Sequence, residues 1–310
     1  MAFVKATEVN LSYSSWLGGS GVNVIKAGVG QKFGEQNVIG LNIETINFGN
    51  IVRTTTNSPE GGLGYFKPNY LNIGISYARV FSNSIYGGMT LRFVNERIED
   101  INASGFALDA GIQYVAGKRD NIHVGVAIRN MGTPMRYTGD GLSITGTSPQ
   151  GYTITQAQRA DKFPLPSLLN IGLAYDFYLG EEPQTGCNPL NKLTLMGQFT
   201  SNSVGKDHFG IGLEYGYRSL FQLRAAYRYE NGITNTDKTT STYTGLAFGA
   251  SVGSPIGNKG TSIMLDYSYR PTKSFSGTHS IGLRFTIGGG ADDCKKAKAG
   301  KKEKTSTNPQ

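Results

Sequence analysis

Hydrophobic and polar residues alternate one by one along most of this chain. The segment 261–270 has Ile263, Leu265, Tyr267 and Tyr269 on one face and Met264, Asp266, Ser268 and Arg270 on the other. A period of two is that of a β-strand, in which successive side chains point to opposite faces. One apolar and one charged face over about 10 residues is typical of a wall strand in an outer-membrane barrel, which has lipid outside and a lumen inside.

The same alternation recurs in about fourteen segments, each with a period of two rather than 3.6. They cover residues 7–16, 22–33, 37–47, 69–81, 84–98, 103–117, 121–131, 168–179, 193–200, 208–218, 221–230, 242–252, 261–270 and 279–287. The sequence therefore predicts an all-β protein, a transmembrane antiparallel β-barrel of about 14 strands. An even number of strands brings both ends of the barrel sequence to the same side.

The connections between these segments alternate between short and long. Residues 48–68, 132–166 and 231–241 are the long ones, and most of the others span a few residues. Outer-membrane barrels have short periplasmic turns and longer outer loops, so we expect an outer-membrane protein with both termini in the periplasm. Aromatic residues near strand ends are interpreted as an interface girdle: Tyr13, Trp16, Tyr65, Tyr77 and Tyr269.

Composition changes this picture little. Hydrophobic residues make up only 38% of the 310 residues and the mean hydropathy is −0.28, so no segment reaches the ~18 apolar residues of a transmembrane helix. Alternating strands average their two faces, which hides a membrane barrel from hydropathy scans. We expect residues 1–288 to form the barrel and residues 289–310 to be a Lys-rich, disordered periplasmic tail.

Charge and motifs argue against two other classes of function. The net charge is +8, but the tail alone contributes six Lys against three acidic residues, and no continuous basic stripe remains for nucleic acid. His123, His208 and His279 each stand alone on a strand, and no catalytic triad, P-loop, paired carboxylates or metal-ligand spacing is present. We expect neither an enzyme nor a cofactor.

Charged residues occupy the face opposite the apolar one. The sequence leaves two interpretations open: a network that pairs within the lumen, or a selectivity surface for a permeating solute. The candidates are Asp109, Arg129, Glu214, Arg218, Arg224, Arg228, Glu230, Asp266 and Arg284.

The two cysteines, Cys187 and Cys294, fall on the predicted periplasmic side. Because the periplasm is oxidising, we hypothesise that they form a disulfide. Two unrelated thiols are the alternative.

Several segments resemble a known family. Residues 1–19, MAFVKATEVNLSYSSWLGG, resemble the segment that follows the NPAxLA motif in FadL-like barrels of the PorV/PorQ family, which belong to the Bacteroidetes type IX secretion system. Residues 62–98, 103–117 and 124–137 resemble that family's most characteristic run, and the similarity is greatest to PorV.

The resemblance implies a fourteen-stranded FadL-like barrel whose N-terminal hatch and leader would precede Met1 and are missing from this chain. It also implies a non-enzymatic component of type IX secretion. Such a protein binds the C-terminal signal domains of exported cargo, associates with the large SprA-type translocon and carries cargo to attachment-complex proteins at the surface, within outer-membrane lipid. We expect the partner contact in the connection 132–166, where Pro134, Met135 and Tyr137 are the least polar candidates of the first part.

Two alternatives remain open. A FadL-like transporter of hydrophobic small molecules would need an apolar pocket in the lumen and an opening in the wall, and the mixed charges of the lumen face argue mildly against it. A soluble secreted β-sandwich or adhesin would have to bury both tyrosine-rich faces.

Overall fold

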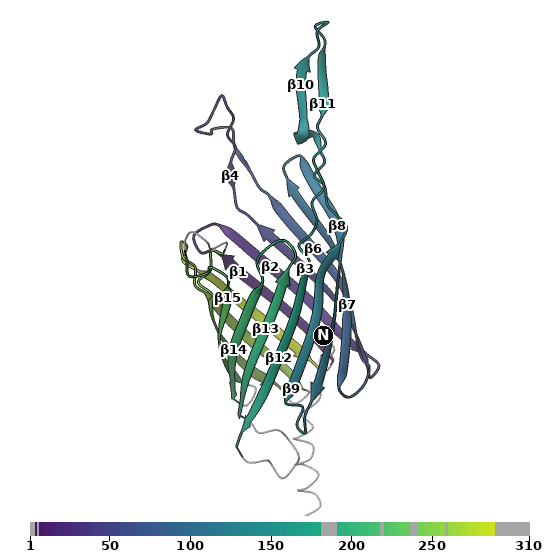
Figure 1. Cartoon of the computed structure of the whole chain (residues 1–310), viewed down its shortest axis with the longest axis vertical. Coiled ribbons are helices and arrows are strands. Elements are labelled where there is room, and N and C mark those ends of the chain that lie inside the picture. Colours follow the sequence, from purple (N-terminus) through teal and green to yellow (C-terminus); the bar gives the residue numbers. More distant parts are fainter. Residues whose placement is uncertain are drawn as a thin grey trace, which may run out of the picture.

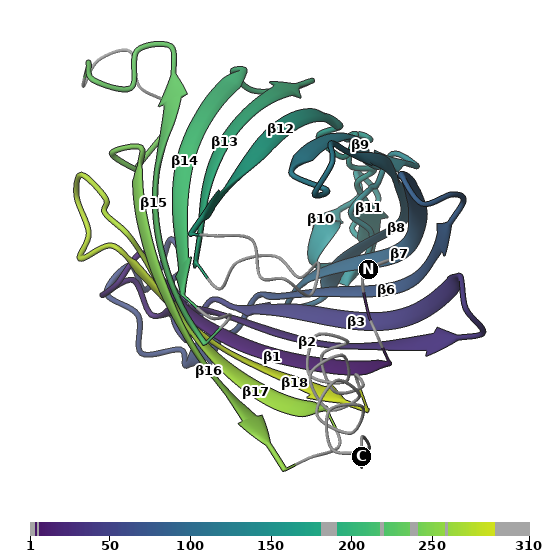
Figure 2. The same cartoon turned by 90° about the horizontal axis from the view of Figure 1, so that it is seen from below.

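The structure, a computed structural model, describes residues 4, 6–180, 191–217, 220–235, 241–257 and 260–288. Within this part, fourteen strands close into one antiparallel barrel, and the first strand pairs with the last (Figures 1 and 2). The strands of the first half are β1 (Thr7–Trp16), β2 (Val22–Phe33), β3 (Asn37–Asn47), β6 (Asn69–Val80), β7 (Ile85–Ile98), β8 (Ile101–Ala116) and β9 (Ile122–Gly132). Those of the second half are β12 (Leu168–Leu179), β13 (Asn191–Asn202), β14 (His208–Tyr217), β15 (Phe221–Glu230), β16 (Leu246–Ile256), β17 (Thr261–Arg270) and β18 (Thr278–Ile287).

The register of the strands keeps apolar side chains together on the outer face. At the seam between β1 and β18, Leu11 lies opposite Leu283 and Tyr13 lies opposite Ile281. Large apolar side chains are exposed on the outer face all around the barrel. For example, Ile75 is 62% exposed and Ile211 is 60% exposed. A one-residue slip would turn these side chains into the lumen, and a continuous apolar outer wall is stable only in lipid. The predicted antiparallel barrel is confirmed.

Most predicted strand boundaries lie within two residues of the observed ones, and β16 is the main exception. It was expected at residues 242–252 but begins at Leu246. Gly245 has φ +97°, and a Cβ there would lie 2.5 Å from the carbonyl oxygen of Arg228. The chain therefore passes close against β15 before the strand begins, which requires glycine.

The two ends of the barrel differ, as the loop lengths predict. Short turns lie at one end, and the long connections rise from the other (Figure 1). Ala6 and Gly288 meet at the short-turn end, where a Cβ on Gly288 would lie 3.7 Å from that of Ala6. Both ends of the barrel sequence are thus on one side, and their assignment to the periplasm stays a prediction. No helix in the described ranges is long and apolar enough to cross a membrane.

The wall is tallest at β7 and β8, the longest strands, which rise above the rest of the rim (Figure 1). The two legs of the connection 133–167 lie against the inner face of this extension. Met135 pairs with Phe163 through its backbone and packs on Val94 and Ala103. A Cβ at Gly105 would lie 2.8 Å from Cγ of Met135, so glycine makes room for this side chain.

Two small hairpins lie outside the barrel sheet. One is β4 (Ile51–Val52) with β5 (Tyr65–Phe66), and the other is β10 (Ser143–Thr147) with β11 (Thr153–Ala157), which follows the 3-10 turn η1 (Asp140–Leu142). The β10–β11 hairpin projects far beyond the rim (Figure 1). The sequence predicted loops here because strands this short, without a buried face, leave little alternation to detect.

Candidate functional site

The lumen wall between β8 and β17 carries mostly small or uncharged side chains. Alternation places one residue in two on the inside, and many of these inward residues are Gly, Ala, Asn, Gln or Thr. They leave a cavity of about 710 Å³ along the inner face. Its lining includes Asn170, Gly172, Met196, Gln198, Gly210 and Ala226.

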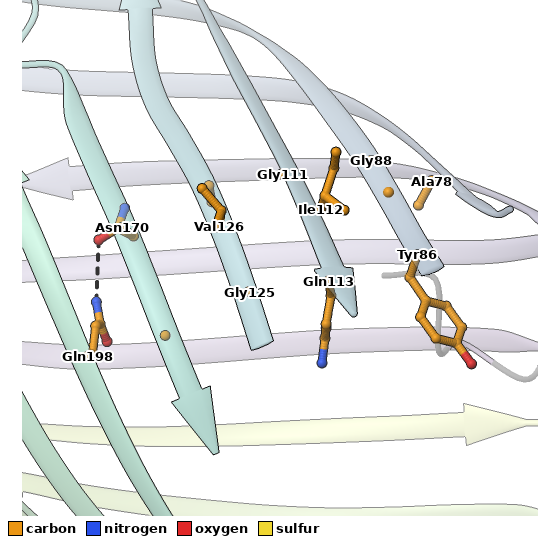
Figure 3. Close-up of a pocket in the computed structure, with 13 residues that line it drawn as sticks. Ala78, Tyr86, Gly88, Gly111, Ile112, Gln113, Gly125, Val126, Asn170 and Gln198 are labelled. Atoms are coloured by element: carbon orange, nitrogen blue, oxygen red, sulfur yellow. Dashed lines mark hydrogen bonds between the residues drawn. The ribbon is translucent and has the colours of Figure 1, made fainter. Parts of the chain in front are cut away.

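A second cavity of about 410 Å³ continues this space toward β6 and β7 (Figure 3). It shares Gly125, Asn170 and Gln198 with the first, and Gln198 Nε2 donates to Asn170 Oδ1 at 3.3 Å. Glycine keeps the wall thin, because Gly88, Gly111 and Gly125 lie on three neighbouring strands. The shared residues make the two cavities neighbours along the lumen wall.

Paired charges form a belt across the lumen side of β14 to β18 and β1. Arg224 Nε lies 2.6 Å from Glu214 Oε2, and Arg224 Nη1 donates to Ser251 Oγ at 2.6 Å. The Ser251 hydroxyl donates in turn to Asp266, which lies 3.5 Å from Nη2 of Arg284. The structure therefore brings together four of the predicted lumen residues. Sequence reasoning missed Ser251 and also Glu8, whose Oε1 lies 3.8 Å from Nε of Arg284.

Asp109 forms a second paired group on the opposite wall. It accepts from Arg92 Nη2 and from the backbone N–H of Asn130, both at 2.8 Å, and lies 3.9 Å from Nε of Arg129. The strand register shifts here, with Arg129 and Asn130 facing the single residue Asp109, and Asn130 has φ +60°. This is a β-bulge, and Asp109 stabilises it by accepting the freed backbone N–H.

Asp176 forms a third group that the sequence did not single out. Its carboxylate lies 3.2 Å from Lys192 Nζ and 3.4 Å from His123 Nε2, and it accepts from the Thr194 hydroxyl at 2.5 Å. The three partners come from β9 and β13, which flank β12. The inward position of Asp176, every second residue from Asn170, was the available signal.

Arg228 is different from the other predicted lumen charges. Among the described residues, no carboxylate lies within ion-pair distance of its guanidinium. Arg228 and Arg270 both line the larger cavity. Arg270 lies over the Tyr243 ring at 3.9 Å, and the Trp16 indole N–H donates to the Tyr243 hydroxyl at 2.8 Å. Trp16 thus turns to the inner rim rather than to the membrane interface, because it continues the inward series of Ser12 and Ser14.

Of the residues predicted to contact a partner, two are anchors within the extension. Met135 is 0% exposed, and Tyr137 stacks on Phe163 with ring centroids 5.4 Å apart. Tyr137 also donates to Glu96 at 2.6 Å, and burial, aided by this carboxylate, raises the pKa of Tyr137 to about 12. Apolar side chains of a loop become buried when they can pack against a neighbouring strand. Pro134 remains exposed, and Tyr152 on the hairpin is 73% exposed.

Other predicted sites lie beyond what the structure describes. Cys187, Cys294, Arg218 and the tail 289–310 are outside the described residues, so the disulfide and the tail stay predictions. Within the described part, no group of His, Cys, Asp and Glu could hold a metal ion.

No protein-family model matches the chain, and no curated protein matches its sequence. Solved structures do match. A TodX deltaS2S3 mutant, a monoaromatic hydrocarbon channel, has a TM-score of 0.56 and 12% identity over 91% of this chain and 90% of that one. The Pseudomonas putida toluene transporter TodX has a TM-score of 0.51 and 11% identity over 90% and 87%. A Pseudomonas aeruginosa FadL homologue has a TM-score of 0.45 and 10% identity over 90% and 88%. The two TodX structures, with TM-scores above 0.5, show that the described chain shares the fold of these channel barrels.

Proposed function

We propose that this protein is an outer-membrane transport barrel through which small molecules with apolar surface pass. The proposal rests on the cavity that the described residues leave along the lumen wall. Barrels of about eight strands are narrow enough for side chains to fill, whereas this wider barrel presents glycine and alanine inward and retains a cavity of about 710 Å³. If the barrel had only a structural role, larger inward side chains could fill this space.

The cavity lining suits a solute that is partly apolar. Leu168, Met196 and Ala247 lie among uncharged polar groups, and no described lining residue is acidic. Apolar walls with a few polar groups are typical of small-molecule sites. The toluene transporter TodX, a protein of the same fold, supports this substrate class.

The route proposed runs along the barrel axis. Strand pairing is continuous around the whole described sheet, including the seam between β1 and β18. The opening in the wall that a lateral route requires is not present among the described strands. The solute therefore enters and leaves through the two ends of the lumen.

The experiment compares two substitutions on neighbouring residues of β15. Ala226 faces the cavity between Gly212 and Ala247, and Ala225 faces outward between Leu213 and Phe248. Ala226→Trp should lower single-channel conductance in planar bilayers, and toluene uptake into proteoliposomes, by roughly twofold or more, because it narrows the lumen. Ala225→Trp should leave both unchanged. A wild-type barrel without conductance or uptake would overturn the proposal.

A second candidate function is the type IX secretion role, with a SprA-type translocon, attachment-complex proteins or exported cargo as partner. The β10–β11 hairpin favours it. Residues 141–158 contain no charge, and the hairpin leaves both edges unpaired and Ile144, Tyr152 and Ile154 exposed. Exposed strand edges without charged residues are templates for pairing with another chain.

The test of this role is affinity purification from the native outer membrane in mild detergent. Recovery of a very large barrel, or of secreted proteins that share a C-terminal β-domain, would support the role. Replacing residues 143–157 by a short Gly-Ser linker should then abolish the recovery while the barrel still inserts. Recovery that survives this replacement would move the contact to another surface.

A further inference from the structure

Two arginines line the upper end of the larger cavity. Arg228 lies two residues before the upper end of β15, and Arg270 is the last residue of β17. Both line the cavity on the side of the long connections. They are close enough for the charge of Arg270 to act on Arg228.

Five other cations of the lumen wall have carboxylate partners. Arg92 pairs with Asp109, Arg224 with Glu214, and Arg284 with Asp266. Lys26 and Lys192 likewise pair, with Glu44 at 3.1 Å and Asp176 at 3.2 Å. Within the described ranges, neither Arg228 nor Arg270 has such a partner. Unpaired charges inside a barrel are costly and point to a function.

The described lining of the cavity is basic rather than acidic. It holds Arg228, Arg270 and two histidines, but no Asp or Glu. The charge of Glu230 also acts on Arg228, yet Glu230 is only 2% exposed, does not line the cavity and lies 3.5 Å from His208 Nδ1. The cavity therefore has an excess of positive charge at its upper end, which attracts anions.

The Arg270 side chain is held in place by an aromatic ring. Tyr243 lies under the guanidinium of Arg270, an arrangement that favours a fixed cation. The Tyr243 hydroxyl is held by the Trp16 indole at 2.8 Å and lies 3.0 Å from the Thr278 hydroxyl. A guanidinium held in one orientation retains its planar set of N–H donors for an incoming group.

We infer that Arg228 and Arg270 form an oxyanion-binding site at the upper end of the lumen. Guanidinium groups donate paired hydrogen bonds to carboxylate, sulfate, sulfonate and phosphate groups. The inference rests on the proposed transport function and narrows it: the solute carries one such group on a body small enough for the cavity, and cations are disfavoured.

The first experiment uses a fluorophore already in place. Trp16 is the single tryptophan of the chain and contacts the Tyr243 hydroxyl beneath Arg270. Because positive potential concentrates anions, iodide should quench Trp16 in the detergent-solubilised barrel more strongly than its quenching by neutral acrylamide predicts. Sulfate at constant ionic strength should compete with iodide.

The variant Arg228→Gln/Arg270→Gln should lower the iodide quenching constant by about two- to threefold and leave the acrylamide constant unchanged. The control is Arg129→Gln, a lumen arginine outside the larger cavity whose side chain is 56% exposed. It should change neither constant. Equal iodide quenching in wild type and double variant, or no competition by sulfate, would overturn the site.

A second measurement separates this inference from the transport proposal. In a salt gradient across a planar bilayer, the reversal potential should indicate anion preference for wild type and for Arg129→Gln, and loss of that preference for the double variant. Conductance without anion preference would reject the oxyanion site and keep transport. Sulfate-sensitive quenching without conductance would keep the site and reject transport.

Discussion

Arg224 and Arg228 lie on the same face of β15, two residues before and two residues after Ala226, yet their surroundings differ. Arg224 contacts Glu214 and Ser251 and lies 4.0 Å from Asp266. Arg228 has no carboxylate partner among the described residues and faces the cavity. The neighbouring strands therefore decide the role of a lumen charge. A charge that they pair with an opposite charge stabilises the wall, and a charge that they leave unpaired faces the passage.

The largest effect should come from removing the paired arginine. Arg224→Leu leaves the Glu214 carboxylate without its cation and leaves Asp266 with Arg284 alone. An unpaired buried carboxylate costs more than the ion pair itself contributes. We expect the free energy of unfolding to fall by about 3 kcal/mol, measured by urea denaturation in detergent micelles. If this variant is as stable as wild type, the belt does not hold the wall together.

A smaller change in stability is expected when the carboxylate left by Arg224→Leu is neutralised as well. Adding Glu214→Gln to Arg224→Leu removes the stranded charge, so about half of the lost stability should return, roughly 1.5 kcal/mol. The same denaturation measurement checks it. Failure of this two-site variant to recover would mean that the cost of Arg224→Leu is lost packing of the side chain.

A change at Tyr137, which lies outside the membrane-spanning wall, should have an effect of intermediate size on stability. Tyr137→Phe removes the hydrogen bond to Glu96 and should lower stability by about 1 kcal/mol. The pKa of this phenol is raised to about 12 in the fold, above its ordinary value near 10. The contribution of protonated Tyr137 is therefore complete below pH 10 and is lost as the pH rises toward 12. Stability measured across this window should fall more steeply in wild type than in Tyr137→Phe.

The smallest effect on stability should come from the unpaired arginine. Arg228→Leu breaks no ion pair and removes repulsion from Arg270, so the free energy of unfolding should change by less than about 0.5 kcal/mol. A loss as large as that of Arg224→Leu would show that Arg228 is a wall residue after all. Thermal unfolding followed by circular dichroism is sufficient for this test.

Much of the barrel was predictable because alternation along one strand determines which face a residue occupies. The segments 7–16, 22–33 and 221–230 were found with their observed boundaries. Which inward charges meet was not predictable, because it depends on the register between strands. Ser251 joins Arg224 to Asp266 only because β16 is paired so that Gly249 lies opposite Arg224 and Ser251 opposite Asp266.

The burial of the predicted partner residues was not predictable for a related reason. Met135 and Tyr137 were chosen because they are apolar and lie in a long connection. The structure folds this connection back onto the inner face of β7 and β8, where Gly105 leaves space for Met135. Nothing local in the sequence distinguishes a loop that returns to its own wall from one that remains open.

The seam between β1 and β18 also has a consequence for the order of events during assembly. Thr7 pairs with Ile287, so the hydrogen bonds that close the barrel join residues from the two ends of its sequence. Contacts this distant along the chain form slowly, and until they form, both edge strands can pair with other chains. The barrel thus cannot close until its last strand has been delivered, and a truncated chain would aggregate through open edges rather than form a narrower barrel.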